Sequence, residues 1–148
     1  MDVMELGDGR VRLRRDGGIA HVELARPEKK NALDGGMFEG LREAARSVSG
    51  DPSVRAVVLS GAGDCFCSGL DFSSFGAMAE GELDADNAEV AAAARDLSPE
   101  GANRAQQIGW LWQEAPMPVI AAVQGAAYGG GLHISLGADV RFIAPDAR

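Results

Sequence analysis

The sequence predicts an α/β fold built from a repeated strand–turn–helix unit. Two apolar runs, at residues 54–60 and 119–123, have the length and the small or branched side chains of buried strands. Each run is followed by a polar residue, a glycine and a loop of small residues, and then by a glycine just before a predicted helix start. Because this junction occurs twice, we expect one structural unit to recur along the chain.

The first third of the chain predicts a hairpin followed by a helix. Residues 11–15 and 18–24 flank Asp16-Gly17, and the second run alternates apolar and polar side chains, as a strand with one buried face does. Pro27 ends that strand, because proline has no N–H to donate to a sheet. Asp34 is then the expected N-cap of a helix that runs to about Val48 with apolar residues at helical spacing.

The rest of the chain predicts one irregular segment that leaves the core, followed by further helix and strand elements. Residues 72–97 are acidic and rich in alanine, which favours a mobile flap that leaves the core. Ser98, followed by a proline and a glutamate, has the pattern of an N-cap, and the helix after it should reach about Glu114. Two prolines then end this helix before the strand at 119–123, and residues 140–144 form a further predicted strand.

Composition excludes several classes of protein. The 148 residues are 46% hydrophobic and 24% charged, which indicates one folded domain with a real core. The formal net charge of −8 argues against nonspecific binding to nucleic acid or to an anionic membrane. Cys65 and Cys67 are too close in sequence for good disulfide geometry and have no zinc-ligand spacing with the two histidines, so we expect a reduced cytoplasmic protein without a metal.

Familiar catalytic motifs fail on specific residues. Phe66 occupies the third glycine position of a dinucleotide-binding fingerprint, no phosphate-binding lysine motif is present, and Ser68 lacks the flanking glycines of a nucleophile elbow. What remains is the pair of glycine-rich junctions at 60–71 and 124–133. Their backbone N–H groups could converge on an enolate or tetrahedral oxyanion. Close packing of two backbones is the alternative explanation of the glycines at 129–131.

Four segments, in this order, resemble a known family. They are A-R-P-E-K-K-N-A-L at 25–33, V-R-A-V-V-L-S-G-A-G at 54–63, F-C-S-G-L-D at 66–71, and P-V-I-A-A-V-Q-G-A-A-Y-G-G-G-L at 118–132, which G-A-D-V-R-F continues at 137–142. Together they resemble the N-terminal portion of the enoyl-CoA hydratase/isomerase (crotonase) superfamily. The resemblance implies a single, incomplete domain over 1–148, a crotonase-like spiral of repeated β-β-α units truncated at the C-terminus, and assembly of the full-length form as trimers or hexamers.

The resemblance also implies a substrate and a site. The substrate is an acyl-CoA thioester, with no cofactor apart from the coenzyme A that the substrate itself carries. The thioester oxygen is expected between the backbone N–H groups of Ser68 and Gly130, while the loop with Lys29 and Lys30 lies along the nucleotide end of coenzyme A. The full set of implied contacts with the coenzyme A thioester comprises Lys29, Lys30, Ala32, Ser68, Gly69, Leu70, Asp71 and Gly130.

Two departures from the family pattern bear on the chemistry. His133 stands where hydratases carry a glutamate that acts on the water, and a histidine can transfer protons near neutral pH. The second glutamate of hydratases and the later helices of the family would fall beyond Arg148. We therefore expect an enzyme of the enoyl-CoA hydratase/isomerase type with catalytic residues Ser68, Gly130 and His133. A non-catalytic acyl-CoA-binding homologue and an inactive fragment are the alternatives.

Overall fold

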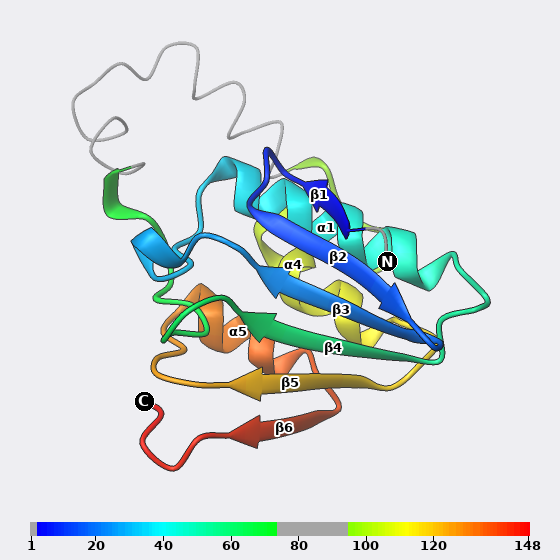
Figure 1. Ribbon diagram of the computed structural model, residues 1–148. Helices are drawn as coiled ribbons and strands as arrows, with labels where there is room; N and C mark the ends of the chain where they lie inside the picture. Colours follow the sequence, from blue (N-terminus) through cyan, green and yellow to red (C-terminus); the bar gives the residue numbers. More distant parts are fainter. Residues whose placement is uncertain (1–2, 74–94) are drawn as a thin grey trace.

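The computed structural model describes residues 3–73 and 95–148. Most of the excursion expected at 72–97 lies outside the described residues. The described strands form one six-stranded sheet whose order follows the chain (Figure 1). The first two pairings are antiparallel and the other three are parallel. The strands are β1 (Val3–Leu6), β2 (Val11–Asp16), β3 (Ile19–Leu24), β4 (Ala56–Gly61), β5 (Val119–Val123) and β6 (Val140–Ile143).

One face of the sheet is buried under the helices. Helices α1 (Gly35–Ser49), α4 (Arg104–Gln113) and α5 (Gly130–Leu136) all lie on this face (Figure 1). Along β2 to β5, alternate residues point into the core, as the pleat of a half-buried sheet requires. These residues are Val11, Leu13, Ala20, Val22, Leu24, Val57, Leu59, Val119, Ala121 and Val123.

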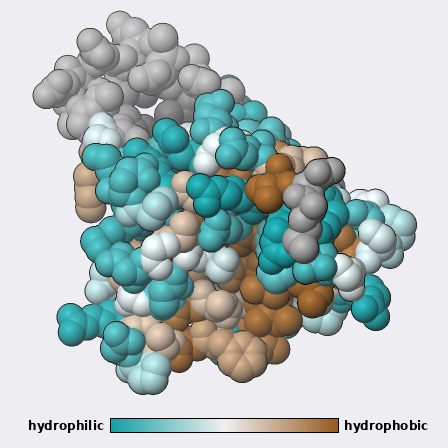
Figure 2. Space-filling model, viewed as in Figure 1, coloured by the Kyte–Doolittle hydropathy of each residue, from teal (hydrophilic) through white to brown (hydrophobic). Residues whose placement is uncertain are grey.

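None of the helices in residues 3–73 and 95–148 covers the opposite face of the sheet (Figure 1). Figure 2 shows this face, on which apolar side chains gather over β4 to β6. Val140 is 48% exposed and Phe142 is 69% exposed on the last strand. Large apolar side chains of this kind are unusual on an uncovered sheet, because their burial is the main driving force of folding.

Strands β3, β4 and β5 are each followed in the chain by a short segment that forms an isolated parallel bridge, and further along by a helix. The short strands are seen as parallel bridges that join Leu33 to Leu70 and Cys67 to Ala127. The three units are therefore β3, Leu33 and α1; β4, the segment 67–70 and α4; and β5, Ala127 and α5. This arrangement confirms the predicted α/β class and its repeated β-β-α units.

The structure also corrects two expectations. Strand β1 was not predicted from the sequence, because most of its side chains are exposed and leave no apolar alternation. Helix α4 begins at Arg104, not beside Ser98, since Asn103 and Gln106 form a reciprocal capping box. Ser98 instead closes a turn in which its carbonyl accepts the N–H of Gly101 at 2.9 Å, and Gly101 has a φ of +91°. The predicted N-cap of α1 is confirmed, because the Asp34 side chain accepts the N–H of Met37.

Candidate active site

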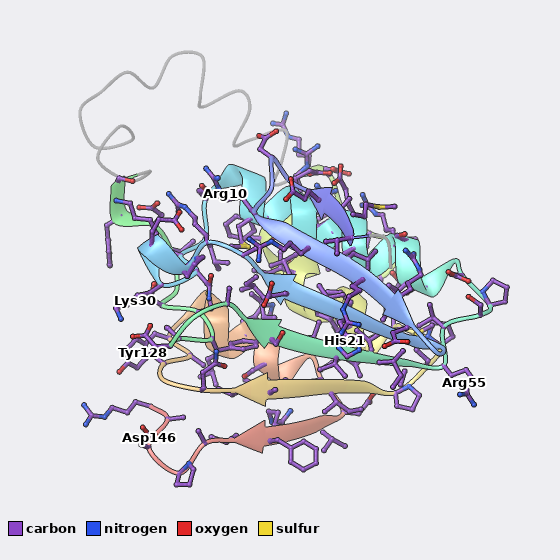
Figure 3. All side chains as sticks on the ribbon, viewed as in Figure 1. Arg10, His21, Lys30, Arg55, Tyr128 and Asp146 are labelled. Carbon is purple, nitrogen blue, oxygen red and sulfur yellow. The ribbon has the colours of Figure 1, made fainter. Side chains whose placement is uncertain are left out.

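The loops that follow β3, β4 and β5 meet at the carboxyl ends of the parallel strands. Figure 3 shows Lys30 and Tyr128 at this end of the sheet, although the two residues lie far apart in the sequence. Ligands of open parallel sheets commonly bind at this edge, because the loops that leave the strands converge there. Both glycine-rich junctions predicted from the sequence lie here.

The N–H of Ser68 is already occupied. It donates to the carbonyl oxygen of Lys30 at 3.0 Å. This bond conflicts with the expectation that Ser68 supplies one of two free amides, since an N–H that holds a protein carbonyl is not available to a substrate. Spacing along the chain could not reveal this, because the acceptor lies in the loop after β3.

The N–H of Leu70 is free and has a defined direction. The carbonyl of Gly69 accepts the N–H of Leu33 at 2.8 Å, and the carbonyl of Leu33 accepts the N–H of Asp71 at 3.0 Å. In a trans peptide the C=O and N–H point in opposite directions. The N–H of Leu70, which shares its peptide plane with the Gly69 carbonyl, therefore points away from Leu33. It has no acceptor within the described part of the chain.

The N–H of Gly130 is free for a similar reason. The carbonyl of Gly129 accepts the N–H of His133 at 3.0 Å, so the Gly130 N–H in the same peptide plane points away from the helix. No acceptor for it is found among residues 3–73 and 95–148.

The segments that carry these two amides pack against each other. A Cβ atom added to Gly69 would lie 2.8 Å from the carbonyl oxygen of Tyr128, two residues before Gly130. A Cβ added to Gly130 would lie 2.4 Å from the side chain of Leu33, which pairs with Leu70. The segments that carry the Leu70 and Gly130 amides are thus in contact, and Gly69, with a φ of +93°, permits the turn between them.

Packing accounts for the last glycine of the triplet. A Cβ on Gly131 would lie 2.4 Å from the backbone oxygen of Cys67. Of the two explanations of the glycines at 129–131, close backbone approach therefore holds for Gly131. The ligand explanation still applies to the adjacent Gly130, whose N–H is unpaired.

A buried asparagine fixes the loop after β3. Asn31 is fully buried and lies in the left-handed region with a φ of 54°. Its amide donates to the carbonyls of Ala62 and Cys65 at 2.9 and 2.7 Å, and its oxygen accepts the N–H of Arg26 at 2.8 Å. Asn31 thus joins the loops of the first and second units. The buried role of Asn31 was not predicted, although an Asn beside a turn in a basic loop was its signal in the sequence.

Asp71, the residue after Leu70, forms an ion pair with Arg26. The guanidinium of Arg26 contacts the carboxylate of Asp71 at 2.6 Å, and Ser73 donates its hydroxyl and its N–H to the same carboxylate. These hydrogen bonds, from Ser73 first and then from Arg26, lower the pKa of Asp71 to about 2. Asp71 was expected to contact coenzyme A, but its carboxylate is engaged inside the protein.

The three residues expected along coenzyme A differ in exposure. Lys29 lies at the end of the short 3-10 helix η1 (Pro27–Lys29) and is exposed. The ammonium of Lys30 is also exposed and lies 3.4 Å from the carboxylate of Asp64. Ala32 is buried, and its carbonyl accepts a bond from Arg26 at 3.3 Å. Two cations are therefore accessible to a phosphate, while Ala32 has a structural contact.

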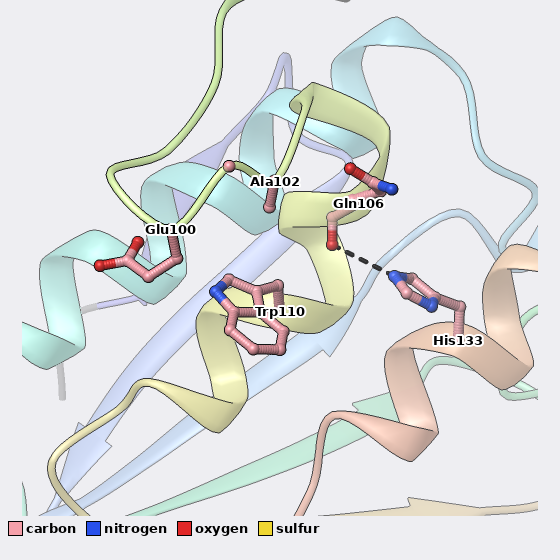
Figure 4. Close-up of a pocket in the computed structure, with 6 residues that line it drawn as sticks. Glu100, Ala102, Gln106, Trp110 and His133 are labelled. Atoms are coloured by element: carbon pink, nitrogen blue, oxygen red, sulfur yellow. Dashed lines mark hydrogen bonds between the residues drawn. The ribbon is translucent and has the colours of Figure 1, made fainter.

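His133 lines an open pocket between α4 and α5. The pocket has a volume of about 280 Å³ and is also lined by Glu100, Gly101, Ala102, Gln106 and Trp110 (Figure 4). The Nε2 atom of His133 lies 3.1 Å from the carbonyl oxygen of Gln106. A carbonyl only accepts hydrogen bonds, so Nε2 is the donor in this contact, and Nδ1 is the ring nitrogen that remains for another partner. The arrangement brings His133 one helical turn from Gly130.

Both cysteines lie in the junction after β4 and are buried free thiols. Burial raises the pKa of Cys67 to about 11, so Cys67 is not an activated thiolate. The described residues contain no group of three metal-binding side chains. None of the helices in the described ranges is long and apolar enough to cross a bilayer.

Comparison with known proteins identifies the family. The family model of enoyl-CoA hydratase/isomerase matches residues 14–148. The chain belongs to this family. It is 36% identical over 129 residues to the mitochondrial Delta(3,5)-Delta(2,4)-dienoyl-CoA isomerase of Mus musculus, covering 87% of this chain and 38% of that protein. A probable enoyl-CoA hydratase of Mycobacterium tuberculosis is also 36% identical over 129 residues, covering 87% of this chain and 44% of that protein.

Solved structures agree with this assignment. A putative enoyl-CoA hydratase from Streptomyces coelicolor matches with a TM-score of 0.76 and 33% identity, over 93% of this chain and 46% of that one. A family member from Mycobacterium abscessus matches with a TM-score of 0.74 and 36% identity, over 93% of this chain and 49% of that one. The chain spans less than half the length of the two curated relatives named above.

Proposed function

We propose that this chain binds an acyl-CoA thioester and polarises its carbonyl between the N–H groups of Leu70 and Gly130. The observation that carries the proposal is that both N–H groups lack an acceptor among residues 3–73 and 95–148, although the segments that carry them are in contact. Two convergent donors stabilise the negative charge that an enolate or tetrahedral intermediate places on oxygen. Leu70 replaces Ser68 in this role, because the Ser68 N–H holds the Lys30 carbonyl.

Family membership gives the chemical class of the ligand. The two curated relatives are named as a dienoyl-CoA isomerase and a probable enoyl-CoA hydratase, and both names specify an unsaturated acyl-CoA. The exposed cations of Lys29 and Lys30 supply charge for a phosphate of coenzyme A. Hydration and double-bond isomerisation both pass through charge on the thioester oxygen, so one pair of donors serves either reaction.

His133 is the proposed acid/base group. With Nε2 bonded to the Gln106 carbonyl, Nδ1 is the nitrogen that can take a proton. A neutral imidazole can act as a base near pH 7, where an ordinary carboxylic acid is already ionised. The alternative is a homologue that binds acyl-CoA without turnover, or a fragment without activity.

Assembly and location follow as further parts of the proposal. The apolar side chains exposed on β6, including Phe142, support an assembled full-length form, for which we propose a trimer or hexamer. The two free, buried cysteines support a reducing compartment, and we propose the cytoplasm. The mouse relative is mitochondrial by name. The proposed cofactor requirement is none beyond the coenzyme A of the substrate.

Infrared spectroscopy tests the carbonyl site without requiring turnover. Crotonyl-CoA labelled with carbon-13 at the thioester carbonyl is added to the protein, and its C=O stretch is recorded free and bound. Two hydrogen bonds should shift the band of the bound thioester to lower frequency. Leu70→Pro removes one of the two donors, which has no acceptor among the described residues, and should reduce the shift while the Gly130 donor remains. Where turnover is present, loss of one donor should lower kcat by about 10²- to 10³-fold.

Matched variants separate the possible donors. Ser68→Ala keeps the backbone N–H and should leave the band where it is. A bound thioester with an unshifted band, or an unchanged shift in Leu70→Pro, would refute the proposed site. His133→Gln tests the acid/base role: a loss of about 10²-fold or more in kcat with an unchanged band supports it. A shifted band without hydration or isomerisation in the wild type identifies the binding homologue instead.

A further inference from the structure

We propose that the ion pair between Arg26 and Asp71 is a positioning device for the Leu70 amide. Neither side chain is assigned to contact a reacting atom, so both are positioning residues and not catalytic ones. The inference rests on the proposed function and adds to it the groups that aim one of its two donors.

Asp71 is the residue whose contacts restrict the backbone at Leu70. It immediately follows Leu70, and its own N–H donates to the Leu33 carbonyl at 3.0 Å. Its side chain is held by Arg26 at 2.6 Å and by Ser73 at 2.6 Å. Backbone and side chain of residue 71 are thus both fixed, so rotation about the backbone at Leu70 is restricted.

Arg26 contacts the segment that contains Leu33. Its backbone N–H donates to Asn31, and its guanidinium donates to the Ala32 carbonyl at 3.3 Å and lies 3.4 Å from the Asp34 carboxylate. Arg26 therefore contacts the residues on both sides of Leu33 in the sequence, Ala32 and Asp34. Because Leu33 pairs with Leu70, the ion pair joins the two short strands side by side at the point where their bridge forms.

Burial of the ion pair between Arg26 and Asp71 costs hydration free energy. The side chains of Arg26 and Asp71 are 11% and 10% exposed. Charges removed from water lose hydration, and buried ion pairs are often no more stabilising than apolar residues of similar size. An apolar pair would pack here but would not fix a direction. A short, directional contact instead sets the orientation of the adjacent peptide plane, and misplacement of about 1 Å can cost about 10²-fold in rate.

Hydrogen exchange in the ligand-free protein is the first test. The N–H of residue 71 is bonded to Leu33, and that of residue 70 is not. Asp71→Asn and Arg26→Gln should each speed exchange of the residue 71 amide by about tenfold or more, because local opening becomes easier. The NMR signal of the residue 70 amide should move in both variants. Arg26→Lys keeps the charge and should restore part of the protection.

The bound thioester gives the second test. Asp71→Asn and Arg26→Gln should lose part of the carbonyl band shift, while the dissociation constant of crotonyl-CoA changes by less than about threefold. For a protein that turns over, kcat should fall by roughly 10- to 100-fold with KM nearly constant, as expected when only transition-state contacts weaken. The double variant should be no worse than either single one, because each removes the same pair.

The control is the exposed ion pair between Arg12 and Glu23, whose atoms lie 3.1 Å apart on β2 and β3. Glu23→Gln should change neither exchange at residue 71 nor the band. The positioning role is overturned if Asp71→Asn, folded by circular dichroism, keeps wild-type exchange at residue 71 and an unmoved residue 70 signal. If the wild-type band is unshifted, the proposed carbonyl site fails, and the exchange experiment still decides whether the pair fixes the amide.

Discussion

Replacement of Asn31 by alanine should be among the most damaging single changes in the chain. The side chain makes three hydrogen bonds to backbone groups, two as donor and one as acceptor. Alanine removes all three and leaves their partners without a replacement, because the position is fully buried. It also forces a residue with a Cβ and no side-chain amide into the left-handed region, where Asn31 has a φ of 54°.

The magnitude follows from these two contributions. Each hydrogen bond contributes about 1 kcal/mol net, so the three together contribute about 3 kcal/mol. The left-handed backbone adds about 1 kcal/mol for alanine and nothing for glycine. We therefore expect a loss of about 4 kcal/mol for Asn31→Ala and about 3 kcal/mol for Asn31→Gly. A typical domain has only about 5–15 kcal/mol in total.

Urea unfolding, followed by circular dichroism and tryptophan fluorescence, measures these losses. The pair of variants separates the side-chain bonds from the backbone conformation. Asn103→Ala is the matched control, since it removes a half-buried N-cap and should cost only about 1 kcal/mol. If Asn31→Ala cost less than the control, the three bonds would not be holding the loops together.

Three further outcomes follow from the packing and the charges. Gly131→Ala should destabilise by about 1–3 kcal/mol in thermal melts, because its Cβ would meet the Cys67 backbone; a wild-type melt would contradict the crowding. The pKa of Asp71 is lowered to about 2 by Ser73 and Arg26, so its stabilisation is present above about pH 4 and is lost as the pH falls from there toward 2. Urea unfolding across this window should show a shallower acid loss in Asp71→Asn, and an unchanged slope would count against the pair. At pH 8 the buried Cys67 thiol should react with a thiol reagent far more slowly in folded than in unfolded protein, and equal rates would show that the junction opens readily.

Local patterns predicted most of the fold. The hairpin around Asp16 and the helix capped by Asp34 are encoded by contiguous residues, and both were confirmed. The start of α4 was wrong for an equally local reason: Ser98 has the chemistry of a cap, but the glycine at 101 takes a positive φ and the capping box at Asn103 competes successfully. Helix-capping propensity alone does not decide which of two possible N-cap residues, Ser98 or Asn103, begins the helix.

The site was less predictable because its determinants are long-range. The family resemblance implied that the amides of Gly130 and Ser68 share one site, but which amide is free depends on the Lys30 carbonyl, which lies in the loop after β3. The same holds for Arg26 and Asp71, which pair across 45 positions. A hydrogen-bond acceptor contributed by another loop leaves no pattern in the donor's own segment. The free Leu70 amide therefore emerged only from the folded chain.

The sheet order, which follows the chain from β1 to β6, has a consequence for synthesis on the ribosome. Each described strand after β1 pairs with the strand that precedes it in the chain. The parallel pairings of β3 to β6 close longer loops than the hairpins of β1 to β3, so they cost more chain entropy and are expected to form more slowly. A nascent chain could therefore add one β-β-α unit at a time as it emerges, with the Leu33 strand waiting for residue 70 to arrive.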